Sequence, residues 1–353
     1  MTKEFLSLGL MSGTSLDGLD IALCHFSVDN NCWSYSIEKA ETIPYTKFWE
    51  NKLREAELLP SVALLELHNE YGHFLGLECK KFLKGCSLPS IVSSHGHTIF
   101  HQPDKGFTYQ LGHGSAIAIT TGIDTVWDFR SSDVLLGGQG APLVPIGDKL
   151  LFPNFDICLN LGGFGNLSYQ NGEKRIAFDT TIVNMALNNL AQEAGHNYDI
   201  NGNLGRNGSL IIDLLHELNS LEYYTITGPK SLGKEWYLTK FKPIMDKFHA
   251  HSLVDRLFTV YEHIAQQTAA AFRNTNAKNV LVTGGGAKNE YLISLLRTKT
   301  TIPITVPDAA TIDFKEALIF AFLGVLFMER IPGSLASVTG ARRNSIAGVL
   351  SKG

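Results

Sequence analysis

A glycine-rich turn between two apolar segments near the start of the chain constrains the fold more than any other feature. Residues 5–10 and 19–26 are apolar and predict two buried strands. The segment from Gly9 to Asp20 reads Gly-Leu-Met-Ser-Gly-Thr-Ser-Leu-Asp-Gly-Leu-Asp. Glycines let a backbone turn tightly and approach a ligand, and N–H groups together with hydroxyls can surround phosphate oxygens. The same residues are common in ordinary turns, so the segment alone favours a phosphate site and a polar β-hairpin equally.

A second glycine-rich turn repeats the first about one domain length further along the chain. Residues 156–161 predict a strand that ends in Gly162-Gly163-Phe164-Gly165-Asn166, after which extended character resumes. In this comparison Leu8-Gly9-Leu10 aligns with Leu159-Asn160-Leu161. The repeat predicts a duplicated fold of two similar domains. Two such domains would bring both turns to an inter-domain cleft, where ligands usually bind.

Strands and helices alternate along the chain, which is typical of an α/β fold. Apolar residues at helical intervals predict helical regions over residues 53–83 and 254–272. Short apolar runs at residues 89–92 and 280–282 predict buried strands.

The chain is long enough for two domains, with 353 residues of which 44% are hydrophobic. The loop that begins at Asp128 is too rich in glycine and charge to be core, and it marks a boundary. We expect one domain over residues 1–127 and a second over 128–334, with segment 335–353 packing back on the first.

Charge and composition exclude several classes of partner. The formal net charge is -4 without runs of like charge, which argues against nucleic acid. The longest apolar run, residues 317–328, is shorter than the roughly 20 residues needed to span a membrane and predicts a buried helix. The five cysteines are odd in number and lack C-x-x-C spacing, and no basic leader precedes the first strand. We therefore expect a cytoplasmic protein with reduced thiols and no membrane partner.

Two carboxylates and a triple glycine lie where strands meet helices. Asp179 follows a predicted strand at residues 175–178, at the sheet edge where α/β folds bind ligands, although position alone favours a helix cap. Glu316 near the start of the apolar helix permits the same two interpretations. The run Gly284-Gly285-Gly286 allows close approach of a nucleoside, but such a turn is a weak signal by itself.

Further segments complete a pattern that runs from end to end. The relevant segments are Gly9 to Asp20, His95-Gly96-His97-Thr98, Asp128-Phe129-Arg130, 137–145, Leu161 to Asn166, Phe178-Asp179-Thr180, 229–231, Gly284 to Asn289, Glu316-Ala317 and 337–341. In these segments the chain resembles the anhydro-N-acetylmuramic acid kinases, a bacterial family of the actin/hexokinase-like ATPase superfamily. The resemblance implies two similar actin/hexokinase-like (ribonuclease H-like) domains with an inter-domain cleft. It also implies a homodimer, which is common in that family.

The resemblance further implies a reaction in cell-wall (peptidoglycan) recycling. Enzymes of the family use ATP, Mg²⁺ and water to open 1,6-anhydro-N-acetylmuramic acid and phosphorylate its O6. The product is N-acetylmuramic acid 6-phosphate. The aspartate that matches Asp179 is the general base on the attacking water, which favours catalysis over capping.

Roles for other residues follow from the same resemblance. The first phosphate turn would comprise Gly9, Ser12, Gly13, Thr14, Ser15, Asp17 and Gly18, with Asp17 near Mg²⁺ through water. The second would comprise Gly162, Gly163 and Asn166, and the adenosine site Gly284, Gly285, Gly286, Asn289 and Glu316. The sugar would contact His95, His97, Asp128 and Arg130. We assign Arg130 to the lactyl carboxylate because a guanidinium binds a carboxylate in bidentate fashion.

The chain departs from the family pattern beside the expected base. Asp179-Thr180-Thr181-Ile182-Val183-Asn184 stands where the family usually has Asp-Thr-Gly-Pro-Gly-Asn. Since β-branched residues avoid positive φ, we expect a differently shaped turn with side chains in space otherwise open to the substrate. His97 and His113 replace the usual glutamine and aspartate on the sugar side.

These departures leave two alternatives to a kinase. One is a non-catalytic nucleotide-binding member that acts as a switch or scaffold. The other is a metallohydrolase that binds zinc through His95, His97, His101 and His113.

Overall fold

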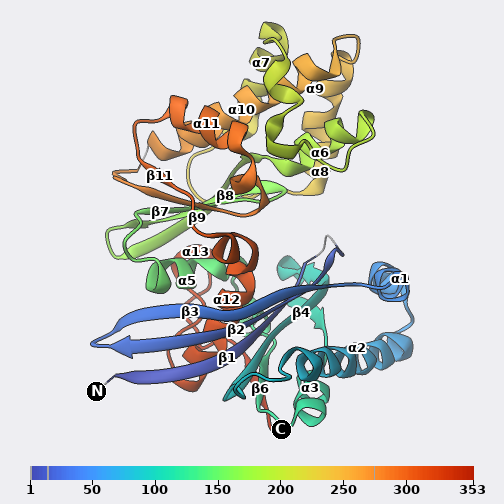
Figure 1. Cartoon of the computed structure of the whole chain (residues 1–353), viewed down its shortest axis with the longest axis vertical. Coiled ribbons are helices and arrows are strands. Elements are labelled where there is room, and N and C mark those ends of the chain that lie inside the picture. The colour runs from blue at the N-terminus through green and yellow to red at the C-terminus, as the bar shows by residue number, and fades with distance from the viewer. Residues whose placement is uncertain (1, 14–15, 274) are drawn as a thin grey trace. The chain divides into compact units, whose positions relative to one another are not determined.

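The structure of the protein is a computed structural model that describes residues 2–13, 16–273 and 275–353. It divides into two compact units (Figure 1). Unit 1 comprises Met1–Phe152 with Phe314–Gly353, and unit 2 comprises Pro153–Asp313.

Unit 1 contains a mixed sheet in the order β12-β6-β4-β1-β2-β3, with β5 paired to β4. Its strands are β1 (Lys3–Ser12), β2 (Gly18–Asp29), β3 (Cys32–Pro44), β4 (Ile91–Gln102), β5 (Phe107–Leu111), β6 (Thr125–Trp127) and β12 (Val349–Ser351). Its helices are α1 (Lys47–Glu55), α2 (Ser61–Phe82), α3 (Gly114–Thr121), α4 (Ser131–Leu135), α5 (Val144–Leu151), α13 (Ala336–Thr339) and most of α12 (Ala309–Met328). The helical region expected over residues 53–83 comprises the end of α1 and the whole of α2, which begins at Ser61 directly after Pro60.

Unit 2 contains a second mixed sheet in the order β11-β10-β7-β8-β9. Its strands are β7 (Ile157–Leu161), β8 (Phe164–Asn171), β9 (Lys174–Ile182), β10 (Val280–Thr283) and β11 (Ile304–Thr305). Its helices are α6 (Asn184–Glu193), α7 (Ile212–Asn219), α8 (Lys234–Trp236), α9 (Lys242–Lys247), α10 (Leu253–Arg273) and α11 (Glu290–Lys299).

The two sheets share one topology, which confirms the predicted duplication of an α/β fold. In each unit the first three strands form an antiparallel meander, β1-β2-β3 in unit 1 and β7-β8-β9 in unit 2. Two further strands are parallel to the first strand of the meander. In unit 1, β4 pairs in parallel with β1 and β6 with β4; in unit 2, β10 pairs in parallel with β7 and β11 with β10. Both glycine-rich turns therefore connect the first and second strands of their sheets.

The sheet of unit 1 has helices on both faces, and the alternation of side chains in β1 explains why. Leu8 and Leu10 pack in a core with Tyr71 and other residues of α2. On the opposite face the Ser7 hydroxyl donates to the carbonyl of Ala321 at 2.9 Å. A side chain on Gly9 would place its Cβ 2.0 Å from a carbonyl oxygen of α12. The helix thus lies directly on the strand backbone.

These contacts explain why the unit boundaries differ from those expected at residues 127 and 334. Unit 1 retains residues 128–152 because α5 packs against β3. It also retains residues from Phe314 onward, because α12 packs on β1 as described above. The apolar run 317–328 forms the second part of this helix, and its residues from 317 to 326 are buried.

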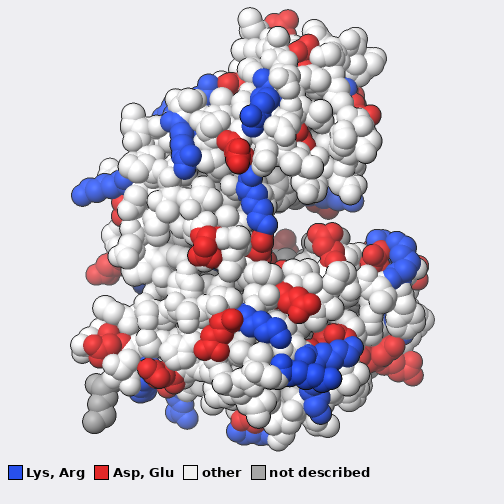
Figure 2. Space-filling view, viewed as in Figure 1, with Lys and Arg blue, Asp and Glu red and all other residues white. Residues whose placement is uncertain are grey.

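None of the described helices is long and apolar enough to cross a membrane. On the face in Figure 2, basic and acidic side chains are interspersed.

Candidate active site

Asp179 is held in place by a segment far away in sequence. Its backbone N–H donates to the Lys230 carbonyl at 2.9 Å, and its carbonyl accepts from the Tyr223 hydroxyl at 2.6 Å. Its Oδ2 accepts from the Leu232 N–H at 2.7 Å. The helix-cap interpretation is wrong, because α6 is capped at Val183 without a side-chain hydrogen bond.

A β-bulge lies next to this aspartate. Asn166 pairs with Asp179 across β8 and β9, whereas Gly165 pairs with Thr181, so Thr180 has no opposite residue. Its hydroxyl donates to the Gly165 carbonyl at 3.0 Å. Directly opposite residues present side chains to the same face, so Asn166 lies beside the Asp179 carboxylate. Bulges often re-aim side chains at functional sites, and this one interrupts the regular pairing of β8 and β9 beside Asp179.

The surroundings of Asp179 suit a proton acceptor. Burial raises the pKa of its carboxyl to about 6, and the hydrogen bond from Leu232 opposes part of that increase. A carboxylate of this pKa is ionised at neutral pH and more basic than an exposed aspartate.

The three departures after Thr180 turn toward the core of unit 2. None of Thr181, Ile182 and Val183 has a positive φ, and all three side chains are buried. The Thr181 hydroxyl lies 2.8 Å from the Tyr224 hydroxyl, which lies 2.9 Å from His263 Nε2. The expectation that these side chains fill substrate space is therefore wrong, because all three are buried, and Ile182 and Val183 belong to the hydrophobic core of unit 2.

The second glycine-rich turn is joined to the start of α6. Gly162 and Gly163 connect β7 and β8, and the Gly163 carbonyl accepts from the N–H groups of Val183 and Met185 at 2.9 and 3.2 Å. Gly163 is exposed, and a Cβ there would meet no atom closer than 4.0 Å. One side of the turn is thus fixed by the helix, and Gly163 remains accessible to a ligand.

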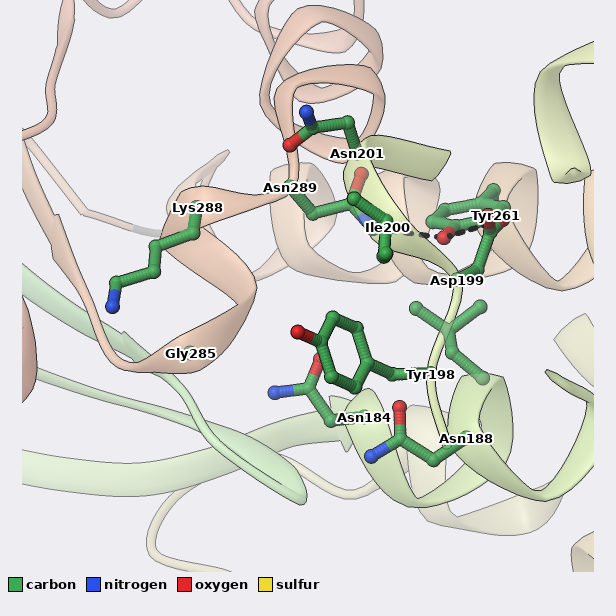
Figure 3. A pocket seen from close by; sticks show the side chains of 11 residues that line it. Asn184, Asn188, Tyr198, Asp199, Ile200, Asn201, Tyr261, Gly285, Lys288 and Asn289 are labelled. Atoms are coloured by element: carbon green, nitrogen blue, oxygen red, sulfur yellow. Dashed lines mark hydrogen bonds between the residues drawn. The ribbon is translucent and has the colours of Figure 1, made fainter. Parts of the chain in front are cut away.

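A cavity of about 420 Å³ lies within unit 2 (Figure 3). It is lined by Asn184, Leu187, Asn188, Tyr198, Asp199, Ile200, Asn201, Tyr261, Gly285, Lys288 and Asn289. In Figure 3 the Tyr198 ring lies between the turn at Gly285 and helix α6, from which Asn184 and Asn188 project. The volume and the mixture of aromatic, apolar and amide groups are typical of a small-molecule site.

The triple glycine contributes one residue to this cavity. Gly285 lines it, and a Cβ there would meet nothing closer than 3.6 Å. Gly284 and Gly286 allow close packing against β7. A Cβ on Gly284 would lie 2.3 Å from Asn160 Oδ1, and a Cβ on Gly286 would lie 2.7 Å from the Leu161 Cβ.

Asn289 shapes the wall of the cavity. Its Oδ1 accepts from the Leu292 N–H at 3.0 Å, which caps α11, and its Nδ2 donates to the Tyr261 hydroxyl at 2.8 Å. Glu316 is exposed on α12 in unit 1, and the described residues that line this cavity do not include it.

The first glycine-rich turn connects β1 and β2 in unit 1. Ser12, at the start of this turn, is buried. Its Oγ accepts from the Tyr45 hydroxyl at 2.7 Å and lies 2.9 Å from His97 Nδ1. The Leu16 N–H donates to the Gly13 carbonyl at 3.3 Å, and Asp17 is exposed. Gly18 lets β3 approach, since a Cβ would lie 2.6 Å from the Ile43 carbonyl oxygen. Thr14 and Ser15 lie outside the described residues.

His95 and Arg130 form one hydrogen-bonded group in unit 1. His95 Nδ1 lies 2.9 Å from the Gly96 carbonyl, which can only accept, so the proton is on Nδ1. The other ring nitrogen accepts from Arg130 Nε and Nη2 at 3.0 and 2.9 Å, and Arg130 Nη1 donates to the Gly140 carbonyl at 2.7 Å. Burial lowers the pKa of Arg130 to about 10, so its charge remains at neutral pH. Burial and Arg130 lower the pKa of His95, which keeps the ring neutral.

The other two expected sugar residues have structural partners as well. The Asp128 Oδ1 accepts from the N–H and the hydroxyl of Ser131 at 3.2 and 2.6 Å, at the start of α4. Burial lowers the pKa of His97 to about 4, so it is neutral beside Ser12. Among the described residues, no group of three or more histidine, cysteine or acidic side chains is placed to hold a metal ion, so the metallohydrolase alternative lacks a ligand cluster.

Comparison with known proteins identifies the family. The model of a family described as "Anhydro-N-acetylmuramic acid kinase" matches residues 5–353. The chain belongs to this family. It is 32% identical over 365 residues to the anhydro-N-acetylmuramic acid kinase of Hydrogenovibrio crunogenus, across 98% of this chain and 97% of that protein. It is 35% identical over 375 residues to the one of Rhodococcus erythropolis, across 98% of this chain and 94% of that protein.

A solved structure is similar at lower sequence identity. It is the activator of the 2-hydroxyisocaproyl-CoA dehydratase from Clostridium difficile with bound ADPNP, at 13% identity and a TM-score of 0.43, and the match covers 92% of this chain and 97% of that chain.

Proposed function

We propose that the protein is an ATP-dependent anhydro-N-acetylmuramic acid kinase of peptidoglycan recycling, with Asp179 as its general base. The observation that carries the proposal is the partly buried Asp179, fixed by three hydrogen bonds and with its pKa raised to about 6. Membership in the family along nearly the whole chain supports the same reaction.

Asp179 takes a proton from water as the water oxygen attacks the anomeric carbon of the anhydro sugar. The bond between that carbon and O6 breaks, and O6 leaves with the electron pair. O6 then attacks the γ-phosphorus of ATP, the bond to ADP breaks, and the products are ADP and the 6-phosphate of the opened sugar. A base of pKa near 6 both accepts the proton and is regenerated at neutral pH.

The cavity of unit 2 suits the adenosine of ATP. Gly285 leaves room for close approach, and the Tyr198 ring and the Asn188 amide offer a stacking face and a hydrogen-bonding edge. The exposed turn at Gly162 and Gly163 suits a phosphate group, and the first turn would hold another. Mg²⁺ neutralises phosphate charge when bound, and the exposed Asp17 carboxylate suits an ion that keeps most of its waters.

Arg130 is proposed to bind the lactyl carboxylate of the sugar. Its bonds to His95 and Gly140 fix the plane of the guanidinium and leave a second N–H on both Nη1 and Nη2. Two parallel N–H groups match the two oxygens of a carboxylate. We also propose a cytoplasmic location, which the odd number of cysteines and their lack of C-x-x-C spacing support.

Turnover with the anhydro sugar tests the proposed function. With ATP, Mg²⁺ and 1,6-anhydro-N-acetylmuramic acid, we expect ADP and the sugar phosphate to form in equal amounts, because each phosphoryl transfer yields both. Coupled ADP detection and mass spectrometry measure the two products. Reactions without the sugar are the control. ADP release at the same rate with and without sugar would instead favour the switch or scaffold alternative.

The raised pKa of Asp179 predicts a pH dependence. Only the ionised carboxylate accepts a proton, so kcat/KM should be level at neutral pH and fall as the pH drops through about 6. The fall should approach about tenfold per pH unit on the acidic side. Initial rates across the acidic range measure it, with circular dichroism at each pH to show that the protein stays folded. A limb near the ordinary pKa of an exposed aspartate would contradict the assignment.

A further inference from the structure

A second cavity, of about 510 Å³, lies within unit 1. It is lined by Ser132, Leu136, Arg330, Pro332, Arg343, Asn344, Ser345 and Ile346. None of these residues takes part in the reaction proposed above. Three separate segments meet there, namely α4, the end of α12 and the segment 343–346.

The charge of this cavity is positive. Arg330 and Arg343 line it without a carboxylate among the described lining residues. The acids beside the lining residues in sequence bind other partners. Glu329 pairs with Lys3 at 2.5 Å, and the buried Asp133 accepts from the Gly140 N–H and the Thr339 hydroxyl at 2.8 Å each. Two guanidinium groups at one cavity repel each other unless an anion lies between them.

Arg330 occupies a backbone position that normally belongs to glycine. It has a φ of 57° just after α12, its N–H donates to the Phe327 carbonyl at 3.1 Å, and the Ile331 N–H donates to the Leu326 carbonyl at 2.9 Å. This is the Schellman pattern of helix ends, in which glycine is preferred at the left-handed residue. A side chain in this conformation is strained, because its Cβ crowds the backbone. The strained backbone at Arg330 points to a role for its side chain.

Ser345 adds a hydroxyl that lacks a partner. The residue is 8% exposed, and its Oγ has no hydrogen-bond partner among the described residues. A buried hydroxyl without a partner is unfavourable, so such groups usually signal a bound water or ligand. Ser345 lines the cavity, and rotation about its Cα–Cβ bond would turn the hydroxyl toward an anion bound there.

We propose that this cavity binds a small multivalent oxyanion, either phosphate or a phosphate monoester. The guanidinium groups of Arg330 and Arg343 supply paired N–H donors, and Ser345 supplies a hydroxyl donor. Leu136, Pro332 and Ile346 provide apolar walls for the organic part of a monoester. Because the ligand joins three segments of unit 1, its binding stabilises that unit.

Titration calorimetry with inorganic phosphate tests the site. We expect saturable binding to the wild-type protein, weakened about tenfold or more in R343Q, because a charge-assisted hydrogen bond is lost. R330G should show the same loss while its melting temperature without phosphate stays equal or rises, because glycine suits the left-handed backbone. R342Q is the matched control, since Arg342 is an exposed neighbour of the same charge outside the lining. It should bind as the wild type does.

The outcomes separate this site from phosphate bound elsewhere. Phosphate held at the glycine-rich turns would bind R330G and R343Q with wild-type affinity, which would overturn the proposal. Equal weakening in R342Q would also overturn it, because general surface charge would then account for phosphate binding. Absence of phosphate binding to the wild type would overturn it as well. Tighter binding of glycerol 3-phosphate than of phosphate would assign a monoester as the ligand, and equal affinities would assign the free ion.

Discussion

Replacing Asp179 by asparagine should lower kcat about a thousandfold and leave ATP binding unchanged, because the amide cannot accept the proton of the attacking water. The substitution preserves the local structure. Two of the three hydrogen bonds of Asp179 involve its backbone, and the third needs only an oxygen to accept from the Leu232 N–H. The variant therefore isolates the chemistry of the carboxylate from its role in packing.

Single-turnover product formation and calorimetric titration with ATP measure the two effects separately. Asp213→Asn is the matched control, because this carboxylate is exposed on α7 in the same unit, and its rates should equal those of the wild type. Wild-type turnover in Asp179→Asn would remove this residue from the mechanism. Loss of ATP binding together with turnover would show that the carboxylate supports the fold of unit 2 instead.

Local patterns in the sequence predicted the parts of the site that depend on neighbouring residues. Local sequence was sufficient to predict the turn at Gly162 and Gly163 and the accessible backbone at Gly285. In both places glycines directly follow an apolar strand, which is a pattern of neighbouring residues. The anchoring of Asp179 was not predictable in this way. Its partners Tyr223 and Leu232 lie 44 and 53 residues further along the chain, and only the tertiary fold brings them close.

The lining of the unit 2 cavity shows the same limit. Asn184 and Asn188 are four residues apart on α6, so the sequence contained the spacing that places both on one helix face. Tyr198 and Asp199 belong to an irregular segment without periodicity. The Asp199 carboxylate accepts from the N–H groups of Leu204 and Gly205 at 2.8 and 2.9 Å. No periodic sequence pattern specifies the loop conformation that these two hydrogen bonds hold.

Gly9, which the resemblance placed in the first phosphate turn, lies within β1 against α12, and this contact predicts a large loss of stability in Gly9→Ala. The added Cβ would lie 2.0 Å from the carbonyl oxygen of Ala317 and 2.8 Å from the amide nitrogen of Ala321. Both are backbone atoms of α12, which cannot rotate away as a side chain can. We expect the free energy of unfolding to fall by about 3 kcal/mol or more, at the upper end for overpacking. Urea denaturation followed by circular dichroism measures the change.

Gly163→Ala in the second turn is the matched control. A Cβ there would meet nothing closer than 4.0 Å and φ is not positive, so stability should change by less than about 1 kcal/mol. Since this turn is proposed to bind phosphate, the KM for ATP should rise instead. Gly9→Ala should show the reverse pattern, with a normal KM for ATP in the protein that remains folded. If Gly9→Ala were as stable as the wild type but bound ATP weakly, Gly9 would belong to the phosphate site and not to the packing of β1 on α12.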